Sequence, residues 1–116
     1  MLHQSQINFI LRGDMVAAGE ITNFSSPIDT SCFKTALFLC KAESISAEDT
    51  LDIDIYTINT LNGMSFLLDS FVQITANGNF SLKITENLGL RIYAIATVAG
   101  AAAVSCTFEL HVVLQD

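Results

Sequence analysis

Residues 104–115 read VSCTFELHVVLQ. Every second residue of this segment is apolar, beginning with Val104, and the residues between them are polar except for Val113. Successive side chains of a β-strand point to opposite faces, so the pattern predicts a strand with one face in a core and the other in water. The same alternation recurs through the second half of the chain, where no helical stripe of comparable length appears. The segment therefore favours an all-β protein.

Turn residues separate about eight segments of this kind. The clearest predicted strands cover residues 33–42, 51–57, 64–68, 71–75, 80–85, 90–98 and 104–115, with a weaker, interrupted one over 15–22. The pair Asn62-Gly63 and the segment 77–79 predict tight turns, and Gly100 predicts a hairpin into the last strand. Short strands at this spacing indicate an antiparallel β-sandwich, either jelly-roll or immunoglobulin-like, with little or no helix.

The chain has 116 residues, enough for one domain around one core. We assign residues 13–116 to a single β-sandwich domain. Residues 1–12 contain the apolar residues Ile7, Phe9, Ile10 and Leu11. These twelve residues form either the first strand or an N-terminal arm that lies on a neighbouring subunit.

The predicted strand over residues 33–42, FKTALFLCKA, is unusual because both of its alternating sets are apolar at the centre. Leu37 and Leu39 form one set, and Ala36, Phe38 and Cys40 form the other. Such a strand is covered on both faces, or its outer face meets another subunit.

Composition also points to association. Hydrophobic residues make up 51% of the chain and mean hydropathy is +0.49, whereas charged residues make up only 15%. Soluble domains usually contain about 25% charged residues. One small sandwich cannot hide so much apolar surface, so we expect it to oligomerise or to dock on a partner.

Two classes of partner are disfavoured. The net charge is −7, and the five lysine and arginine residues do not cluster, so the chain lacks the basic footprint of nucleic-acid binding.

The longest uncharged stretch, 92–108, is shorter than the roughly 20 residues of a membrane-spanning helix and is interrupted by Gly100. No basic region precedes an apolar block at the N-terminus, so we expect the protein to stay in the cytoplasm until assembly.

The sequence offers no convincing catalytic, cofactor or metal site, and we do not expect an enzyme. Cys32, Cys40 and Cys106 are an odd number without a close pair, which favours reduced, largely buried thiols. His111 and Glu109 share one strand face, but no nucleophile or third ligand accompanies them. We interpret them as a solvated pair or a subunit contact.

The acidic residues of the 43–54 region do not match a calcium loop, because the required glycine is missing. They are Glu43, Glu48, Asp49, Asp52 and Asp54. We interpret them mainly as solvated charges, or else as a surface for a cation or a basic partner. Tyr56 and Tyr93 are the only candidates for a sugar-stacking platform, and an interfacial or half-buried position suits tyrosine better.

Three segments resemble the small β-sandwich decoration (cement) proteins of tailed-bacteriophage heads. They are LDIDI at 51–55 before the Asn-Gly turn, FVQITANGNFSL at 71–82, and LGLRI at 88–92 leading to SCTFEL at 105–110. The likeness covers a little over half of the chain. Family members tend to have a tryptophan after the Asn-Gly turn, where this chain has Met64-Ser65-Phe66.

The resemblance implies a homo-oligomer, with a homotrimer favoured, that binds the major capsid protein on the outer surface of the virion head. It brings no catalytic residue and no cofactor. We expect three contributors to the contacts: an arm, an apolar outer face and an acidic loop. They are Ile7, Phe9, Ile10 and Leu11; Ala36, Phe38 and Cys40; and Glu48, Asp49, Asp52 and Asp54, respectively. The alternatives are a phage tail or fibre component and a carbohydrate-binding or adhesion module.

Overall fold

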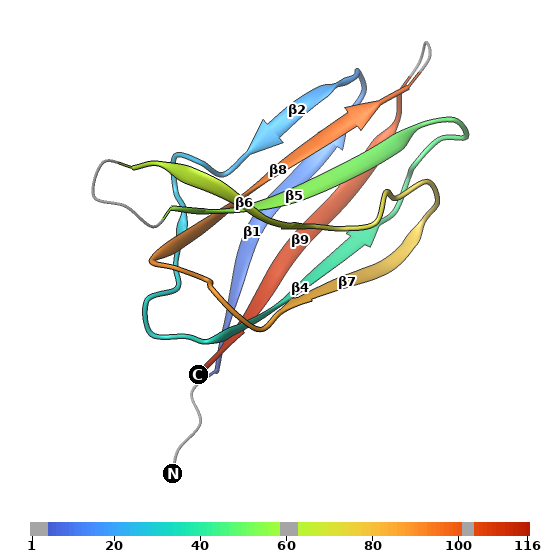
Figure 1. Ribbon diagram of the computed structural model, residues 1–116. Helices are drawn as coiled ribbons and strands as arrows, with labels where there is room; N and C mark the ends of the chain where they lie inside the picture. The colour runs from blue at the N-terminus through green and yellow to red at the C-terminus, as the bar shows by residue number, and fades with distance from the viewer. Residues whose placement is uncertain (1–4, 59–62, 101–103) are drawn as a thin grey trace.

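The computed structural model describes residues 5–58, 63–100 and 104–116, and these residues form two packed antiparallel sheets (Figure 1). Sheet A has the strand order β1-β9-β4-β7, and sheet B has the order β2-β8-β5-β6 with β3 also paired to β8. No helix occurs among the described residues. The strands are β1 Ser5–Met15, β2 Gly19–Thr22, β3 Ile28–Asp29, β4 Thr35–Ala42, β5 Thr50–Ile58, β6 Ser65–Ser70, β7 Gly78–Ile84, β8 Arg91–Ala99 and β9 Cys106–Gln115.

The strand order is that of a jelly roll. Without the two-residue β3, the first strand pairs with the last, β1 with β9, and the pairing continues inward as β2 with β8, β4 with β7 and β5 with β6. The chain therefore behaves as one long antiparallel hairpin that is wound up, and the winding adds the pairs β4–β9 and β5–β8. This decides between the two sandwich topologies that the sequence left open.

The core lies between the two inner faces and follows the alternation in the sequence. Leu51, Ile53 and Ile55 of β5 have no exposed surface, as predicted, and Phe108 of β9 is equally buried. Phe38 of β4 packs into the same cluster from sheet A. Each strand thus contributes every second residue to one continuous core.

Three sequence predictions about the strands require correction or a choice. Residues 5–15 form β1, which pairs along its length with β9 of the same chain, so this segment is the first strand of the sandwich and not an arm. Residues 71–75 contain one isolated bridge, Leu51 to Ile74, in place of a strand. The strands on either side of Gly100, β8 and β9, lie in different sheets and therefore do not form a hairpin.

The physical reason is the same for the last two errors. An alternating segment shows which side chains can be buried, but not which strand supplies its hydrogen bonds. A connection that crosses between sheets has the same turn residues as a connection within one sheet. Residues 59–62 and 101–103 lie outside the described residues. They include part of the predicted turn at Asn62-Gly63 and the residues that follow Gly100.

The orientation of β4 can be tested by a matched pair of truncations. Phe38 is 1% exposed and Leu39 is 40% exposed. We expect Phe38→Ala to lower the free energy of unfolding by about 3–5 kcal/mol, because it leaves a cavity in the core. Leu39→Ala should change it by less than about 1 kcal/mol in dilute protein, where subunit contacts contribute least. Urea unfolding measures both, and equal losses would contradict this orientation.

Candidate functional site

The outer face of sheet A carries a block of apolar side chains, here called the apolar face: Ile7, Phe9, Leu37, Leu39 and Val113. All of them are exposed except Val113, which is half-buried. The strand register places them in two neighbouring rows, Ile7–Val113–Leu37 and Phe9–His111–Leu39. Ile7 is 73% exposed and Phe9 is 56% exposed. The ring of His111 lies inside the block, in an edge-to-face contact with Phe9 at 5.4 Å between ring centroids. Nothing in the described part of the chain covers this face.

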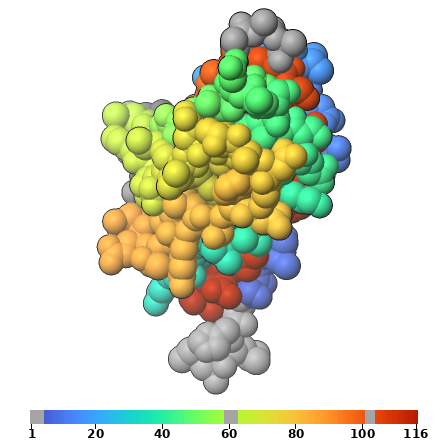
Figure 2. Space-filling view, turned by 90° about the vertical axis from the view of Figure 1, so that its right-hand side faces the viewer, coloured from blue at the N-terminus to red at the C-terminus, as the bar shows by residue number. Residues whose placement is uncertain are grey.

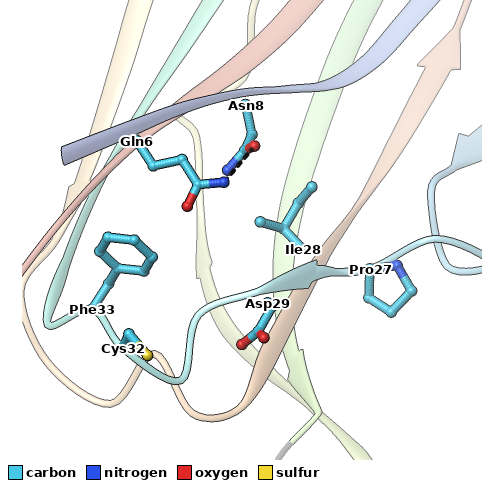
Figure 3. Close-up of a pocket in the computed structure, with 7 residues that line it drawn as sticks. All are labelled: Gln6, Asn8, Pro27, Ile28, Asp29, Cys32 and Phe33. Atoms are coloured by element: carbon cyan, nitrogen blue, oxygen red, sulfur yellow. Dashed lines mark hydrogen bonds between the residues drawn. The ribbon is translucent and has the colours of Figure 1, made fainter. Parts of the chain in front are cut away.

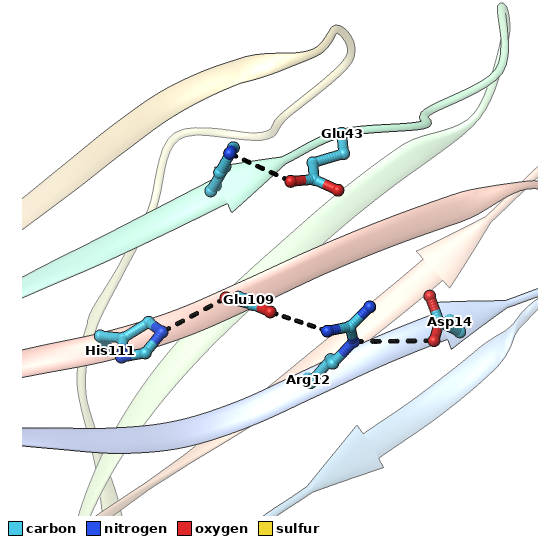
Figure 4. A network of polar contacts seen from close by, with 6 residues as sticks. Arg12, Asp14, Glu43, Glu109 and His111 are labelled. Carbon is cyan, nitrogen blue, oxygen red and sulfur yellow. Dashed lines mark hydrogen bonds and ion pairs between the residues drawn. The ribbon is translucent and has the colours of Figure 1, made fainter.

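A row of ion pairs borders the apolar face (Figure 4). Arg12 Nη1 lies 2.9 Å from Glu109 Oε1, and Lys41 Nζ lies 3.1 Å from Glu43 Oε1. Glu109 Oε2 also lies 3.5 Å from His111 Nε2. Exposed pairs of this kind contribute at most about 1 kcal/mol each to stability. They can nevertheless orient a partner, because their charges remain accessible.

The same face is hollowed between β4, β7 and β9. The hollow has a volume of about 420 Å³, and its wall is largely apolar. Ile7, Leu39 and Val113 supply apolar walls, while Glu109 and His111 stand at its charged side. A side chain from another protein could therefore insert into the apolar face.

A second exposed apolar surface lies along β6 and the segment that follows it, here called the β6 edge: Phe66, Leu67 and Val72. Their exposed fractions are 49%, 59% and 89%. Figure 2 views the side of the molecule where the chain passes from β6 toward β7. Asp69 in β6 and Asp52 in the adjacent β5 add negative charge beside these apolar residues. The molecule thus has apolar surfaces on a broad face and along one edge.

An aromatic row crosses the outer face of sheet B. Tyr56 and Tyr93 are cross-strand neighbours and stack at 5.3 Å, and Phe24 packs edge-on against Tyr93 at 4.9 Å. Tyr93 is only 6% exposed, and its hydroxyl donates to Ser65 Oγ at 2.8 Å. The tyrosines therefore hold strands together, and Tyr93 is not an open platform for a sugar ring.

The predicted apolar outer face of β4 was assigned to the wrong set of residues. Ala36, Phe38 and Cys40 are at most 2% exposed and point into the core. Leu37 and Leu39 of the alternate set face outward. Since both sets are apolar, the sequence indicated a two-sided strand but not which side was the outside.

The four residues expected to form an arm are also divided between the core and the outer face. Ile10 and Leu11 are buried, whereas Ile7 and Phe9 belong to the apolar face. A bulge between Phe9 and Leu11 changes the register against β9. This bulge lets two consecutive residues, Ile10 and Leu11, both turn inward, which simple alternation would not allow.

The acidic residues expected to form one loop surface are also separated. Asp49 is 3% exposed, and its Oδ2 accepts a hydrogen bond from the Ser105 backbone N–H at 2.9 Å. Asp52 accepts from the Gln73 side chain, and Asp54 accepts from the Ser70 hydroxyl at 2.6 Å. Asp49 is therefore structural, while Glu48 is exposed and Asp52 and Asp54 are half-buried.

A separate pocket of about 470 Å³ opens between β1 and β3 (Figure 3). Gln6 Nε2 donates to Asn8 Oδ1 within it, and Cys32 and Asp29 lie on the other side. The Asp29 carboxylate accepts hydrogen bonds from the backbone N–H and from the hydroxyl of Ser31. These two bonds, of which the backbone bond has the larger effect, hold the pKa of Asp29 below its usual value. Among the described residues, the lining of this pocket contains no histidine, lysine or arginine.

The other two thiols, Cys40 and Cys106, are buried. Burial raises the pKa of Cys40 to about 12. The pKa of Cys106 is also raised, mainly by burial and to a smaller extent by the nearby negative charge of Asp49. All three cysteines are free. Within the described residues, no group of three histidine, cysteine, aspartate or glutamate side chains could hold a metal ion. Residues 5–58, 63–100 and 104–116 also contain no helix that could cross a membrane.

The sequence matches no protein-family model, and no curated protein sequence matches it. The geometry of the described residues therefore has to carry the functional argument. Sequence reasoning missed Leu37, Leu39, Phe66 and Leu67 as exposed residues. The available signal was an apolar residue at the outward position of a strand that already had an apolar inner set.

Thiol labelling tests this arrangement. At mildly alkaline pH, a disulfide reagent such as Ellman's reagent should modify Cys32 in the native protein and leave the other two thiols unreacted. Both Cys40 and Cys106 should react once the chain is unfolded, because burial and the disfavoured thiolate protect them in the fold. The Cys32→Ser variant serves as the control and should show no native labelling. Rapid reaction of that variant would contradict the burial of the remaining thiols.

Proposed function

We propose that this chain is a structural protein of a tailed-phage virion, a decoration protein that binds the outer surface of the head. In this role it acts as a homo-oligomer, with three copies favoured, and contacts the major capsid protein. It is assembled in the host cytoplasm and stabilises the capsid lattice without chemistry of its own. The sequence resemblance and the two exposed apolar surfaces support this proposal.

The observation that carries the proposal is the amount and placement of uncovered apolar surface. A monomeric soluble protein rarely exposes a contiguous apolar patch larger than a few hundred Å². Here the apolar face and the β6 edge lie on different sides of the sandwich. One surface can join copies of the chain while the remainder of the oligomer rests on the shell.

Weak contacts are sufficient for this task. Each copy in an oligomer binds a lattice that repeats with the same symmetry, so the second and third contacts form at a high effective concentration. Exposed Glu48 in the β4–β5 loop adds attraction to basic groups on the shell. Buried Asp49 is not available for this contact.

Glycan binding is less well supported by the site. Sugar-binding sandwiches present open aromatic rings, whereas Tyr93 is buried under its neighbours and its hydroxyl is already engaged by Ser65. Phe24 and Tyr56 remain partly accessible but contact Tyr93 rather than standing free.

Binding to purified heads tests the proposal. Expanded empty heads that lack this protein, made from the major capsid protein of the virus that encodes it, would be mixed with the purified chain and sedimented. We expect saturable binding at a fixed ratio to the capsid protein, together with heads that disassemble at a higher temperature. Tails from the same virus provide the matched comparison.

Each outcome decides between the structural roles. Binding to heads alone supports decoration. Binding to tails alone would replace it with a tail or fibre role, and binding to neither would overturn a virion role. Unexpanded heads should bind less, because decoration depends on the spacing of the mature lattice.

A further inference from the structure

We infer that copies of this chain associate head to tail, with the apolar face of one copy packed against the β6 edge of the next. This inference deepens the proposed function and rests on the self-association that it contains. It assigns the occupant of the apolar face to a second copy of the chain.

The two surfaces carry complementary charges. Four of the five basic residues lie in or directly beside sheet A, namely Arg12, Lys34, Lys41 and Lys83. Arg12 is already paired with Asp14 and Glu109, and Lys41 with Glu43. Strands β5 and β6 carry three aspartates and no basic residue, and these are Asp52, Asp54 and Asp69. Within the described residues, Lys83 and all three aspartates lack an ion-pair partner. A contact between copies would bring opposite charges together.

The register places these charges where they can meet. Lys83 pairs with Leu37 across β4 and β7, so its position ends the Ile7–Val113–Leu37 row of the apolar face. Lys41 lies one row beyond Leu39 on the same strand face. On the other surface, Leu67 is the cross-strand neighbour of Tyr56 on the outer face of sheet B. A register shift between Ile55 and Tyr56 makes Asp69 the neighbour of Ile55, so Asp69 lies on the opposite side of the same edge strand. Each surface is therefore an apolar centre with charge at its margin, as in protein interfaces generally.

The size of the β6 edge sets the size of the interface. The principal dimensions of the molecule are 50 × 32 × 19 Å. Residues 65–72 of the β6 edge span about 26 Å of extended chain, so an edge up to 19 Å deep supplies roughly 500 Å², less than the ~800 Å² per partner of a standard interface. The broad face of sheet A is larger than this, so the edge limits the contact.

The proposed contact joins two different surfaces of the same chain. A contact between two different surfaces is heterologous, and it gives a ring if the rotation closes or a filament if it does not. The trimer favoured for decoration corresponds to the ring.

Charge reversal on each surface tests the inference. The face variant is Lys41→Glu with Lys83→Glu, and the edge variant is Asp52→Lys with Asp69→Lys. We expect each variant to weaken association by about tenfold or more in sedimentation velocity. A chain carrying all four changes should recover most of the loss, because every contact again joins opposite charges.

Two controls match the charge changes. Glu20→Lys lies on β2, at the opposite edge of sheet B, and Arg91→Glu reverses the one basic residue outside sheet A. Neither should alter association by more than about twofold. Circular dichroism confirms that every variant is folded before it is compared.

Several results would overturn the inference. Association that is unchanged by the edge variant but lost in the face variant would indicate two-fold pairing of apolar faces. If the chain with all four substitutions does not recover association, the proposed charge contact is wrong. Binding of a monomer to heads would overturn this inference and leave decoration intact, whereas a charge-dependent ring that ignores heads would overturn decoration alone.

Discussion

Each strand in this chain has two faces, and a two-layer sandwich can bury only one of them. The inner faces meet around Phe38, Leu51 and Phe108, where burial is nearly complete. That burial supplies the main favourable free energy of folding for a small domain. Once the inner set is used, any further apolar residue must lie on an outer face or at an edge. The apolar face and the β6 edge are the consequence.

This constraint explains what could be predicted from sequence. Where only one alternating set is apolar, as in Leu51, Ile53 and Ile55, the inward face was predicted correctly. Where both sets are apolar, as in β4, the sequence indicated two-sided burial but assigned the outer face to Phe38 and its neighbours instead of Leu37 and Leu39. The free energy difference between these orientations depends on the volume available opposite each side chain, and only the assembled sheets define that volume.

Other features depend on contacts between distant segments. The bulge that turns both Ile10 and Leu11 inward is set by the partner strand β9. The burial of Asp49 depends on the backbone N–H of Ser105, fifty-six residues away in sequence. The wound jelly-roll order could not be chosen over an immunoglobulin-like order from alternation alone, because strands in both topologies have the same period.

The proposed role follows from the same physical balance. Exposed apolar side chains provide association energy but little specificity, whereas the charges around them select the partner and its orientation. The apolar face would otherwise be a liability for aggregation, and its border of ion pairs together with the acidic net charge limits nonspecific contacts. A regular assembly turns this excess apolar surface into stabilisation of a larger lattice.

Hydroxyl-radical footprinting as a function of protein concentration tests most directly whether these surfaces are covered by other copies. As the concentration rises through the association range, oxidation of Phe9, Leu39, Phe66 and Leu67 should fall together. Oxidation of Phe24, which is 53% exposed on the outer face of sheet B, should stay constant. Oxidation at the first four residues that is the same at every concentration would contradict the account, because the apolar face and the β6 edge would then remain in water.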